Sequence, residues 1–291
     1  MFQMRTLREV IIDAKERKVA VGHFNFSTLD GAHAIARAAR ILGLPVILGV
    51  SEGERDFVGV RSAVAITSAI RAEFNQEIYL NADHTYSVAR VREAIDAGFD
   101  MAIFDGAKLS LDENISSAKE SVKYAKKCGR EVLVEGELGY IGQSSKVFDE
   151  IPEGAAIGDD QMTTPEEAVR FVAESGVDLF SPAIGSIHGM LRSHKNPNLH
   201  IDSLSAISAV LKIPLVLHGA SGLADQNVRD AISAGISLVH VNTELRVAWQ
   251  SALKIALQEN PEEVAPYKIL KASSIAMEKV VENKLKLFNN L

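Results

Sequence analysis

An aspartate and a histidine stand side by side in the stretch YLNADHTYS, where an apolar run gives way to polar residues. Asp83 and His84 place a carboxylate and an imidazole on consecutive residues. Such a pair serves as a base beside a metal ligand, as a catalytic pair, or as a helix cap next to an unrelated histidine. The neighbouring candidates must decide between these three interpretations.

Other polar residues occupy the same kind of position, near the end of an apolar run. They are Asn25, Ser51, Asp105, Glu137, His188, His218, His240 and Asn242. A single histidine at such a position is more often a hydrogen-bonded structural residue than a ligand. Several histidines and acids brought together are different, because burying that much polar surface is costly unless the groups are paired or bound to metal.

The sequence therefore predicts a metal site. Three imidazoles with an open fourth position suit a catalytic zinc ion, although imidazole also suits iron, cobalt and nickel. Asp105 and Glu137 are either further ligands or partners that orient the histidines.

A second candidate site lies in HGASG and VNTEL, which follow the last two apolar runs. Gly219 and Gly222 let a backbone approach an anion closely, and Ser221 and Thr243 add hydroxyl donors. Turn glycines and a helix cap explain the same residues without a ligand. Beside a metal site we favour a phosphate-binding loop.

Eight short, nearly continuous apolar runs must position these residues. They span residues 20–26, 45–50, 77–82, 101–105, 131–136, 177–182, 213–219 and 237–242. Such runs are typical of parallel strands covered on both faces, and helical patterns lie between them. Eight strand–helix units predict an α/β fold, a closed (β/α)8 TIM barrel with its site at the carboxyl ends of the strands. A doubly wound open sheet is the alternative.

Local signals mark where helices begin and end. Ser110 with Glu113, and Thr164 with Glu167, form predicted capping boxes. Left-handed stops are expected at Gly43, Gly98, Gly129, Gly176 and Gly235.

The remaining segments complete the predicted organisation. The stretch 138–163 is a long polar loop of the kind that often covers an active site. Residues 261–291 are predicted as an extra C-terminal helical tail. Because no linker appears, we expect one domain over residues 1–291.

Bulk properties narrow the functional class. The 291 residues carry 31 basic and 38 acidic side chains without a basic block, which argues against nucleic acid as a partner. No apolar run approaches the roughly 20 residues of a membrane span, so no membrane association is expected. A single cysteine, Cys128, and a charged N-terminal stretch predict a cytoplasmic protein.

Five ordered motifs carry a family resemblance: YLNADH, EGELG, AIGSIHG, PLVLHGASG and VNTEL. Over nearly its whole length the chain resembles the class II, metal-dependent ketose-bisphosphate aldolases. The resemblance implies cleavage of fructose 1,6-bisphosphate to dihydroxyacetone phosphate and glyceraldehyde 3-phosphate. The alternatives are the same chemistry on another phosphorylated ketose, such as tagatose 1,6-bisphosphate, and a non-catalytic sugar-phosphate-binding descendant.

The resemblance also implies roles for single residues. The three zinc ligands correspond to His84, His188 and His218. Asp83 corresponds to the base that moves the proton next to the ketone, and Asp105 and Glu137 to acids near a second metal position. Implied phosphate and substrate contacts, some of them near a monovalent cation, are Asn25, Ser51, Gly189, Gly219, Ser221 and Thr243, and we group Asn242 with them.

Two departures from the family pattern concern the aldehyde half of the substrate. Ser144 and Ser145 stand where an acidic pair is usual in a mobile loop. The candidates to replace that pair are Asp149, Glu150 and Glu153. Tyr267 stands where an arginine from a neighbouring subunit often binds the second phosphate. Unless Lys268 or Arg192 compensates, the aldehyde half is unphosphorylated or differently charged.

Further departures lie at the strand ends. His240 stands where an asparagine is usual; it either contacts substrate or acts as an acid or base, or simply replaces an amide donor. Thr85 and Ala107 stand where a glycine and a serine are usual. The family also suggests a homodimer or homotetramer, with the helical tail as an interface.

Overall fold

The structure, a computed structural model, describes residues 4–142, 146–151, 153, 155, 158, 161–193 and 196–291. Its centre is a closed barrel of parallel strands in the order β1-β10-β9-β7-β5-β4-β3-β2. The barrel strands are β1 (Val21–Asn25), β2 (Val46–Val50), β3 (Ile78–Thr85), β4 (Met101–Phe104), β5 (Leu133–Leu138), β7 (Leu179–Pro182), β9 (Leu215–Leu217) and β10 (Ile236–Val241). Each of the predicted apolar runs contains or overlaps one of them, so the TIM-barrel prediction is confirmed and the open sheet was wrong.

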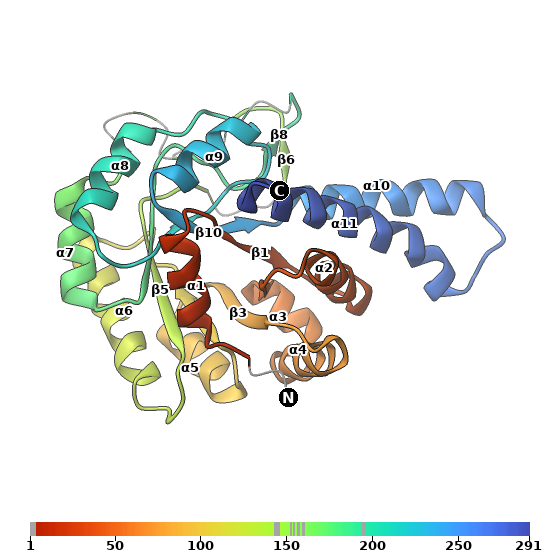
Figure 1. The fold of residues 1–291 in the computed structure, drawn as a ribbon, viewed down its shortest axis with the longest axis horizontal. Helices are drawn as coiled ribbons and strands as arrows, with labels where there is room; N and C mark the ends of the chain where they lie inside the picture. The colour runs from red at the N-terminus through yellow and green to blue at the C-terminus, as the bar shows by residue number, and fades with distance from the viewer. Residues whose placement is uncertain are drawn as a thin grey trace.

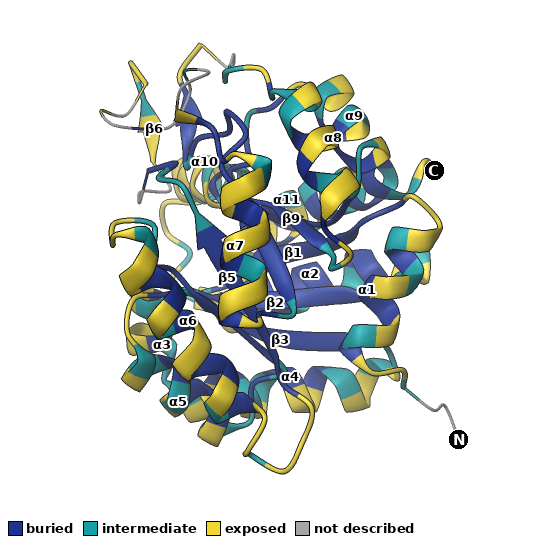
Figure 2. Cartoon of the chain, turned by 90° about the vertical axis from the view of Figure 1, so that its left-hand side faces the viewer, coloured by how far each residue is buried: buried dark blue, intermediate teal, exposed yellow. Residues whose placement is uncertain are grey.

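Helices surround the barrel and leave one face of each in solvent, as Figure 2 shows. They are α1 (Leu7–Glu16), α2 (Leu29–Leu42), α3 (Glu52–Val58), α4 (Val60–Phe74), α5 (Val88–Ala97), α6 (Leu111–Ala125), α7 (Pro165–Ser175), α8 (Ile201–Val210), α9 (Asp225–Ser233), α10 (Thr243–Glu259) and α11 (Pro266–Asn289). None of the described helices is long and apolar enough to cross a membrane.

The predicted helix signals are confirmed in most places. Capping boxes begin α6 and α7, with Ser110 and Thr164 as the N-cap residues. Gly43, Gly98 and Gly176 are left-handed C-caps. The other two glycines also have positive φ, but they lie beyond the cap residue, because α6 ends at Ala125 and α9 at Ser233.

The interior of the barrel is apolar at one end and polar at the other. The apolar layer consists of Val21, Ile47, Tyr79, Met101, Leu133, Leu179, Val216 and Leu238. Residues of α1 belong to the same buried cluster, so this helix closes the amino-terminal end of the barrel. Because strand side chains alternate in direction, residues two positions further along point into the same interior. There they form a buried polar layer of His23, Asn81, Glu135, His218 and His240.

The C-terminal tail begins with a hairpin that projects from the barrel (Figure 1). Helix α10 leads outward and α11 returns to pack on α2, where Arg37 Nε donates to Glu278 Oε2 at 2.8 Å. The predicted helical tail is thus confirmed, with its helix beginning at Pro266.

In the long loop after β5, a short strand β6 (Val147–Phe148) pairs with β8 (Met190–Leu191). This pairing ties the predicted covering loop to the segment that carries His188.

Candidate active site

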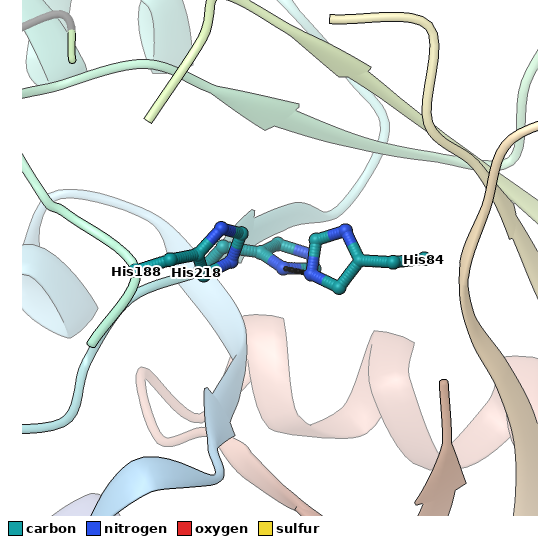
Figure 3. Close-up of side chains that lie close together, drawn as sticks. All are labelled: His84, His188 and His218. Atoms are coloured by element: carbon teal, nitrogen blue, oxygen red, sulfur yellow. Dashed lines mark hydrogen bonds between the residues drawn. The ribbon is translucent and has the colours of Figure 1, made fainter. Parts of the chain in front are cut away.

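Three imidazoles converge at the polar end of the barrel (Figure 3). His84 lies at the end of β3, His218 directly follows β9, and His188 lies between β7 and β8. One nitrogen from each ring lies within 4.8 Å of the others. His218 Nδ1 and His84 Nε2 are 3.2 Å apart. The structure therefore brings together the three histidines that the sequence singled out as ligands.

Hydrogen bonds orient the outer nitrogens of two of these rings. His84 Nδ1 lies 2.9 Å from Asp105 Oδ2, and His188 Nδ1 lies 2.7 Å from the carbonyl oxygen of Gly142. A carbonyl can only accept, so His188 carries its proton on Nδ1 and turns the lone pair of Nε2 inward. Fixing an imidazole through its other nitrogen is the usual way to prepare it as a metal ligand.

Glu135 orients the third ring and was missed by the sequence analysis. Its Oε1 lies 2.7 Å from His218 Nε2, in the fully buried interior. Burial raises the pKa of this carboxyl well above its usual range, with repulsion from Asp83 adding to the effect. Glu135 lies two positions before Glu137 on the same strand. Because side chains alternate along a strand, the sequence could have placed Glu135 on the same inward face as Glu137.

The spacing of the inner nitrogens fits a bound metal ion. Two ring nitrogens at 3.2 Å need a positive centre, either a proton or a metal ion. Tetrahedral zinc with Zn–N bonds of about 2.0–2.1 Å holds its nitrogens about 3.3–3.4 Å apart. The converging imidazoles thus offer the donor atoms that this metal takes, and the nitrogens of His84 and His218 also match its spacing.

The pKa values of the three rings differ: two are lowered and one is raised. Burial lowers the pKa of His188 and that of His218 to about 3, which leaves both neutral and able to bind metal. Burial also acts to lower the pKa of His84, but Asp83 and Asp105 outweigh it and raise that pKa well above its usual range. Positive charge is therefore favoured at the position of His84.

A second group of possible ligands consists of His84, Asp105 and Glu137, with ligand atoms again within 4.8 Å of one another. Burial raises the pKa of Glu137 well above its usual range, and repulsion from Asp105 adds to the effect. Two buried carboxyl groups this close favour a cation between them. The geometry agrees with the expectation that these acids lie near a second metal position.

Asp83 lies beside the imidazoles with one oxygen held and the other free. Asn25 Nδ2 donates to Asp83 Oδ2 at 2.8 Å, whereas Oδ1 has no hydrogen-bond partner among the described residues. Burial would raise the pKa of Asp83, but the charge of His84 and the proximity of His240 lower it well below its usual range. The carboxylate is ionised, and its free oxygen can accept a proton.

His240 lies within reach of this free oxygen, with Nδ1 3.4 Å from Asp83 Oδ1. Its ring stacks on that of His23, with centroids 3.6 Å apart and an interplanar angle of 13°. Closure of the barrel pairs these two residues directly, because β1 lies beside β10 in that register. Stacked rings cannot both direct an in-plane lone pair at one metal ion, so this pair is a poor chelator.

Room for His23, which the sequence analysis also missed, comes from a glycine on the next strand. A Cβ added at Gly49 would lie 2.1 Å from His23 Cε1. Burial lowers the pKa of His23 to about 4, so the ring is neutral.

A charged network reaches from Asp83 to α10. Glu54 Oε2 accepts from Asn25 Nδ2 at 2.7 Å and from the Ser51 hydroxyl at 2.8 Å. Arg246 Nη2 donates to the other oxygen, Oε1, at 2.6 Å. Neither Glu54 nor Arg246 was predicted, since neither stands at a strand end.

Thr85 is explained by a buried arginine. Arg55 is only 1% exposed. Its guanidinium donates to Thr85 Oγ1 at 3.0 Å and to the Asp83 carbonyl at 3.1 Å. Between these contacts His84 has a φ of 32°, which is rare for a residue other than glycine. Arg55 and Thr85 therefore hold the end of β3 in the conformation that presents Asp83 and His84.

The predicted phosphate loop lies next to the histidines. A small cavity of ≈ 30 Å³ is bordered by Asn25, Asp83, His84, His188, Gly189, His218, Gly219, Ser221, His240, Asn242 and Thr243. Gly219 has a φ of 67°, and a Cβ there would lie 2.5 Å from the carbonyl oxygen of Ile187. Only glycine fits this close approach to Ile187, so the packing of the turn alone already requires Gly219.

The residues considered as replacements for the family's acidic loop pair and for its second-phosphate arginine do not lie at the described cavities beside Asp83. Asp149 and Arg192 pair with each other at the surface, and Lys268 pairs with Glu263. Glu150 and Glu153 are exposed, as is Tyr267. None of these residues borders the described cavities that contain Asp83. Ser144 and Ser145 lie outside the described residues.

Barrel architecture and converging imidazoles together are those of a metal-dependent TIM-barrel enzyme. Comparison with known proteins then gives the family. The chain belongs to the class-II fructose-bisphosphate aldolases, whose family pattern matches residues 5–291. This is a metal-dependent family of carbon–carbon lyases that act on phosphorylated sugars.

Individual relatives differ in substrate. The chain is 34% identical over 282 residues to a 6-phospho-5-dehydro-2-deoxy-D-gluconate aldolase of Shouchella clausii, covering 96% of this chain and 92% of that one. It is 33% identical over 286 residues to a fructose-bisphosphate aldolase of Staphylococcus aureus, covering 97% and 96%.

Solved structures of the family share the fold. The YdjI aldolase of Escherichia coli K12 superposes with a TM-score of 0.80 at 25% identity, covering 98% of this chain and 97% of that one. A fructose-bisphosphate aldolase of Campylobacter jejuni superposes with a TM-score of 0.78 at 21% identity, covering 97% and 94%.

Proposed function

We propose that this chain is a zinc-dependent aldolase that cleaves a phosphorylated ketose to dihydroxyacetone phosphate and an aldehyde, and that catalyses the reverse addition. The observation that carries the proposal is the free Oδ1 atom of Asp83 beside three oriented imidazoles. A base and a metal site on adjacent residues suit the removal of a proton from the carbon next to a ketone.

Each group has a separate task in this proposal. His84, His188 and His218 hold the metal through their inner nitrogens. When bound, the metal polarises the ketone and acidifies the neighbouring C–H bond. Asp83 takes that proton on Oδ1, while Asn25 holds its other oxygen and so fixes the plane of the carboxylate.

The phosphate of dihydroxyacetone phosphate is proposed to bind at the start of α10. Gly189, Gly219, Ser221 and Thr243 border the same small cavity as Asp83, and the helix begins at Thr243. Free N–H groups at a helix start, with hydroxyl donors beside them, suit an anion. Substrate held there would present its ketone to the histidines.

Fructose 1,6-bisphosphate is the substrate expected from the family. The second candidate, 6-phospho-5-dehydro-2-deoxy-D-gluconate, is favoured by the identity of 34% to an aldolase of that name. Both substrates release dihydroxyacetone phosphate. They differ in the aldehyde, which is glyceraldehyde 3-phosphate from the first and 3-oxopropanoate from the second.

Proton exchange on dihydroxyacetone phosphate in D₂O tests the shared half-reaction without any aldehyde. We expect the zinc-loaded protein to exchange one C3 proton, as followed by NMR, and a chelator to abolish the exchange. A zinc-loaded protein that leaves both protons in place would overturn the aldolase proposal.

Two properties of the whole protein also remain proposals. We infer a cytoplasmic enzyme from the single cysteine, Cys128, and a homodimer or homotetramer from the family resemblance. Fractionation of source cells tests the first, and a sedimentation mass equal to that of one chain would contradict the second.

A further inference from the structure

A second cavity, of ≈ 210 Å³, borders the catalytic base. It shares Asp83, His84, His188 and Asn242 with the small cavity and extends between the start of α3 and α10. The proposed phosphate contacts Gly189, Gly219, Ser221 and Thr243 border only the small cavity. The small cavity, at ≈ 30 Å³, cannot hold the whole of dihydroxyacetone phosphate. With the phosphate at the glycine loop, the reacting carbon and the aldehyde fragment would extend into this second cavity, beside Asp83.

We propose that Arg246 binds an acidic group on the aldehyde fragment, and that this group is a carboxylate. The inference rests on the proposed aldolase function and adds the class of the second substrate. The sequence motifs assign no role to Arg246.

Arg246 is the only lysine or arginine among the described residues that borders either cavity. Its Nη2 atom donates to Glu54, and the guanidinium makes no other hydrogen bond to the described residues. The side chain is 43% exposed. Since a guanidinium carries five N–H donors, an edge remains available for a planar acid.

The charge around Arg246 favours a monoanion over a phosphate. Glu52 and Asp83 border the same cavity, and Glu54 already pairs with the guanidinium. Because Coulomb repulsion scales with the charge of the ligand, these carboxylates by themselves oppose a phosphate of charge about −1.5 to −2 more strongly than a carboxylate of −1. A metal ion at the histidines would offset part of this difference. One shared arginine suits one carboxylate, which it can bind through two parallel hydrogen bonds.

The position of Arg246 also connects acid binding to the base. Hydrogen bonds run from Arg246 to Glu54, from Asn25 to Glu54, and from Asn25 to Asp83. A carboxylate on the free edge of Arg246 would place the aldehyde carbon of a short fragment near Asp83. In the addition, Asp83 takes the C3 proton of dihydroxyacetone phosphate and C3 bonds to the aldehyde carbon. Asp83 then returns that proton to the aldehyde oxygen, which becomes a hydroxyl group. The carboxylate itself does not react.

The test compares kcat/KM for addition of dihydroxyacetone phosphate to 3-oxopropanoate, glyceraldehyde 3-phosphate and glyceraldehyde. We expect the zinc-loaded wild type to prefer 3-oxopropanoate. In Arg246→Met the preference for 3-oxopropanoate over glyceraldehyde should fall about 10- to 100-fold, the usual worth of a hydrogen-bonded charge pair. Arg246→Lys should recover part of the preference.

Two further variants keep the result interpretable. Arg246→Met leaves buried Glu54 without its cation, so the double variant with Glu54→Gln is measured beside it and should show the same fall. Arg17→Met, which removes the exposed arginine that follows α1 as its C-cap at the other end of the barrel, should keep the wild-type preference.

Specific outcomes overturn the inference. An unchanged preference in Arg246→Met and in the double variant removes the role of Arg246. A wild type that prefers glyceraldehyde 3-phosphate to 3-oxopropanoate removes the carboxylate assignment. Either result, with normal proton exchange on dihydroxyacetone phosphate, would leave the aldolase proposal standing, whereas loss of exchange in the wild type would overturn both.

Discussion

The three histidines are each held by a separate hydrogen bond to a group behind the ring, whereas on the side of α3 and α10 several side chains share one carboxylate, that of Glu54. Each outer imidazole nitrogen meets a carboxylate or a backbone carbonyl, which points the inner nitrogen at one place. On the other side, Glu54 accepts from Asn25, Ser51 and Arg246 at once.

The metal side and the α3/α10 side differ in how strictly each side chain must be positioned. A metal site needs three nitrogens at about 3.3 Å from one another, so each ring must be fixed individually. A fragment-binding wall needs charge balance and shape, and one shared carboxylate can supply both. The metal side should therefore respond to single substitutions in metal affinity, and the opposite wall in substrate preference.

The largest effect is expected from Asp83→Asn. It removes the base but keeps a side chain of similar size, so proton exchange on dihydroxyacetone phosphate should fall about 10²- to 10⁴-fold. Zinc content, measured by atomic emission, should stay near one ion per chain. Exchange that survives in this variant would assign the base to another residue, with His240 as the first candidate.

Next in size is the loss of the Glu135 contact. Glu135→Leu removes the acceptor for His218 Nε2, and zinc affinity should fall about 10- to 100-fold in a competition titration. Glu135→Gln keeps an acceptor and should recover part of that affinity. Equal affinities in the wild type and in Glu135→Leu would show that the ring of His218 needs no such partner.

Arg55 links the two sides, and its loss should cost stability. Arg55→Met leaves the carbonyls of Val50 and Asp83 without their donor, which is worth about 1–3 kcal/mol per buried group in the free energy of unfolding. Urea denaturation measures the loss. The matched change Thr85→Ser keeps the hydroxyl and should have a much smaller effect; a similar loss in both variants would point to packing instead of hydrogen bonding.

The smallest effect concerns the pH dependence contributed by His23. Its pKa is about 4 in the folded chain, because of burial, against an ordinary value of 6.5. Between these two pH values the unfolded chain binds a proton that the folded chain does not, so stability falls as the pH is lowered, by up to about 1.4 kcal/mol per unit.

The variant His23→Gln removes this titration, and its unfolding free energy should therefore lose less between pH 6.5 and pH 4.5 than that of the wild type. Identical slopes in urea titrations of the two proteins would contradict the shift in the pKa of His23.

The sequence by itself determined the barrel and the converging histidines. Strand runs, glycine stops and capping boxes are local signals, and they repeat along the chain with the period that each element requires. Polar residues at the ends of such runs must meet in a parallel barrel, whatever the details of its packing. These strand ends, or the segments just after them, carry His84, His188, His218 and His240, and the family resemblance then implied which three of them are the ligands.

Only the tertiary structure decided which residues support that site. Glu135 reaches His218 across 83 positions, and Arg246 reaches Glu54 across 192. His23 meets His240 because the barrel closes with β1 beside β10. Such contacts depend on closure and on strand register, which link positions distant in sequence. Alternation along β5 places Glu135 on the inward face, but it does not identify His218 as the partner.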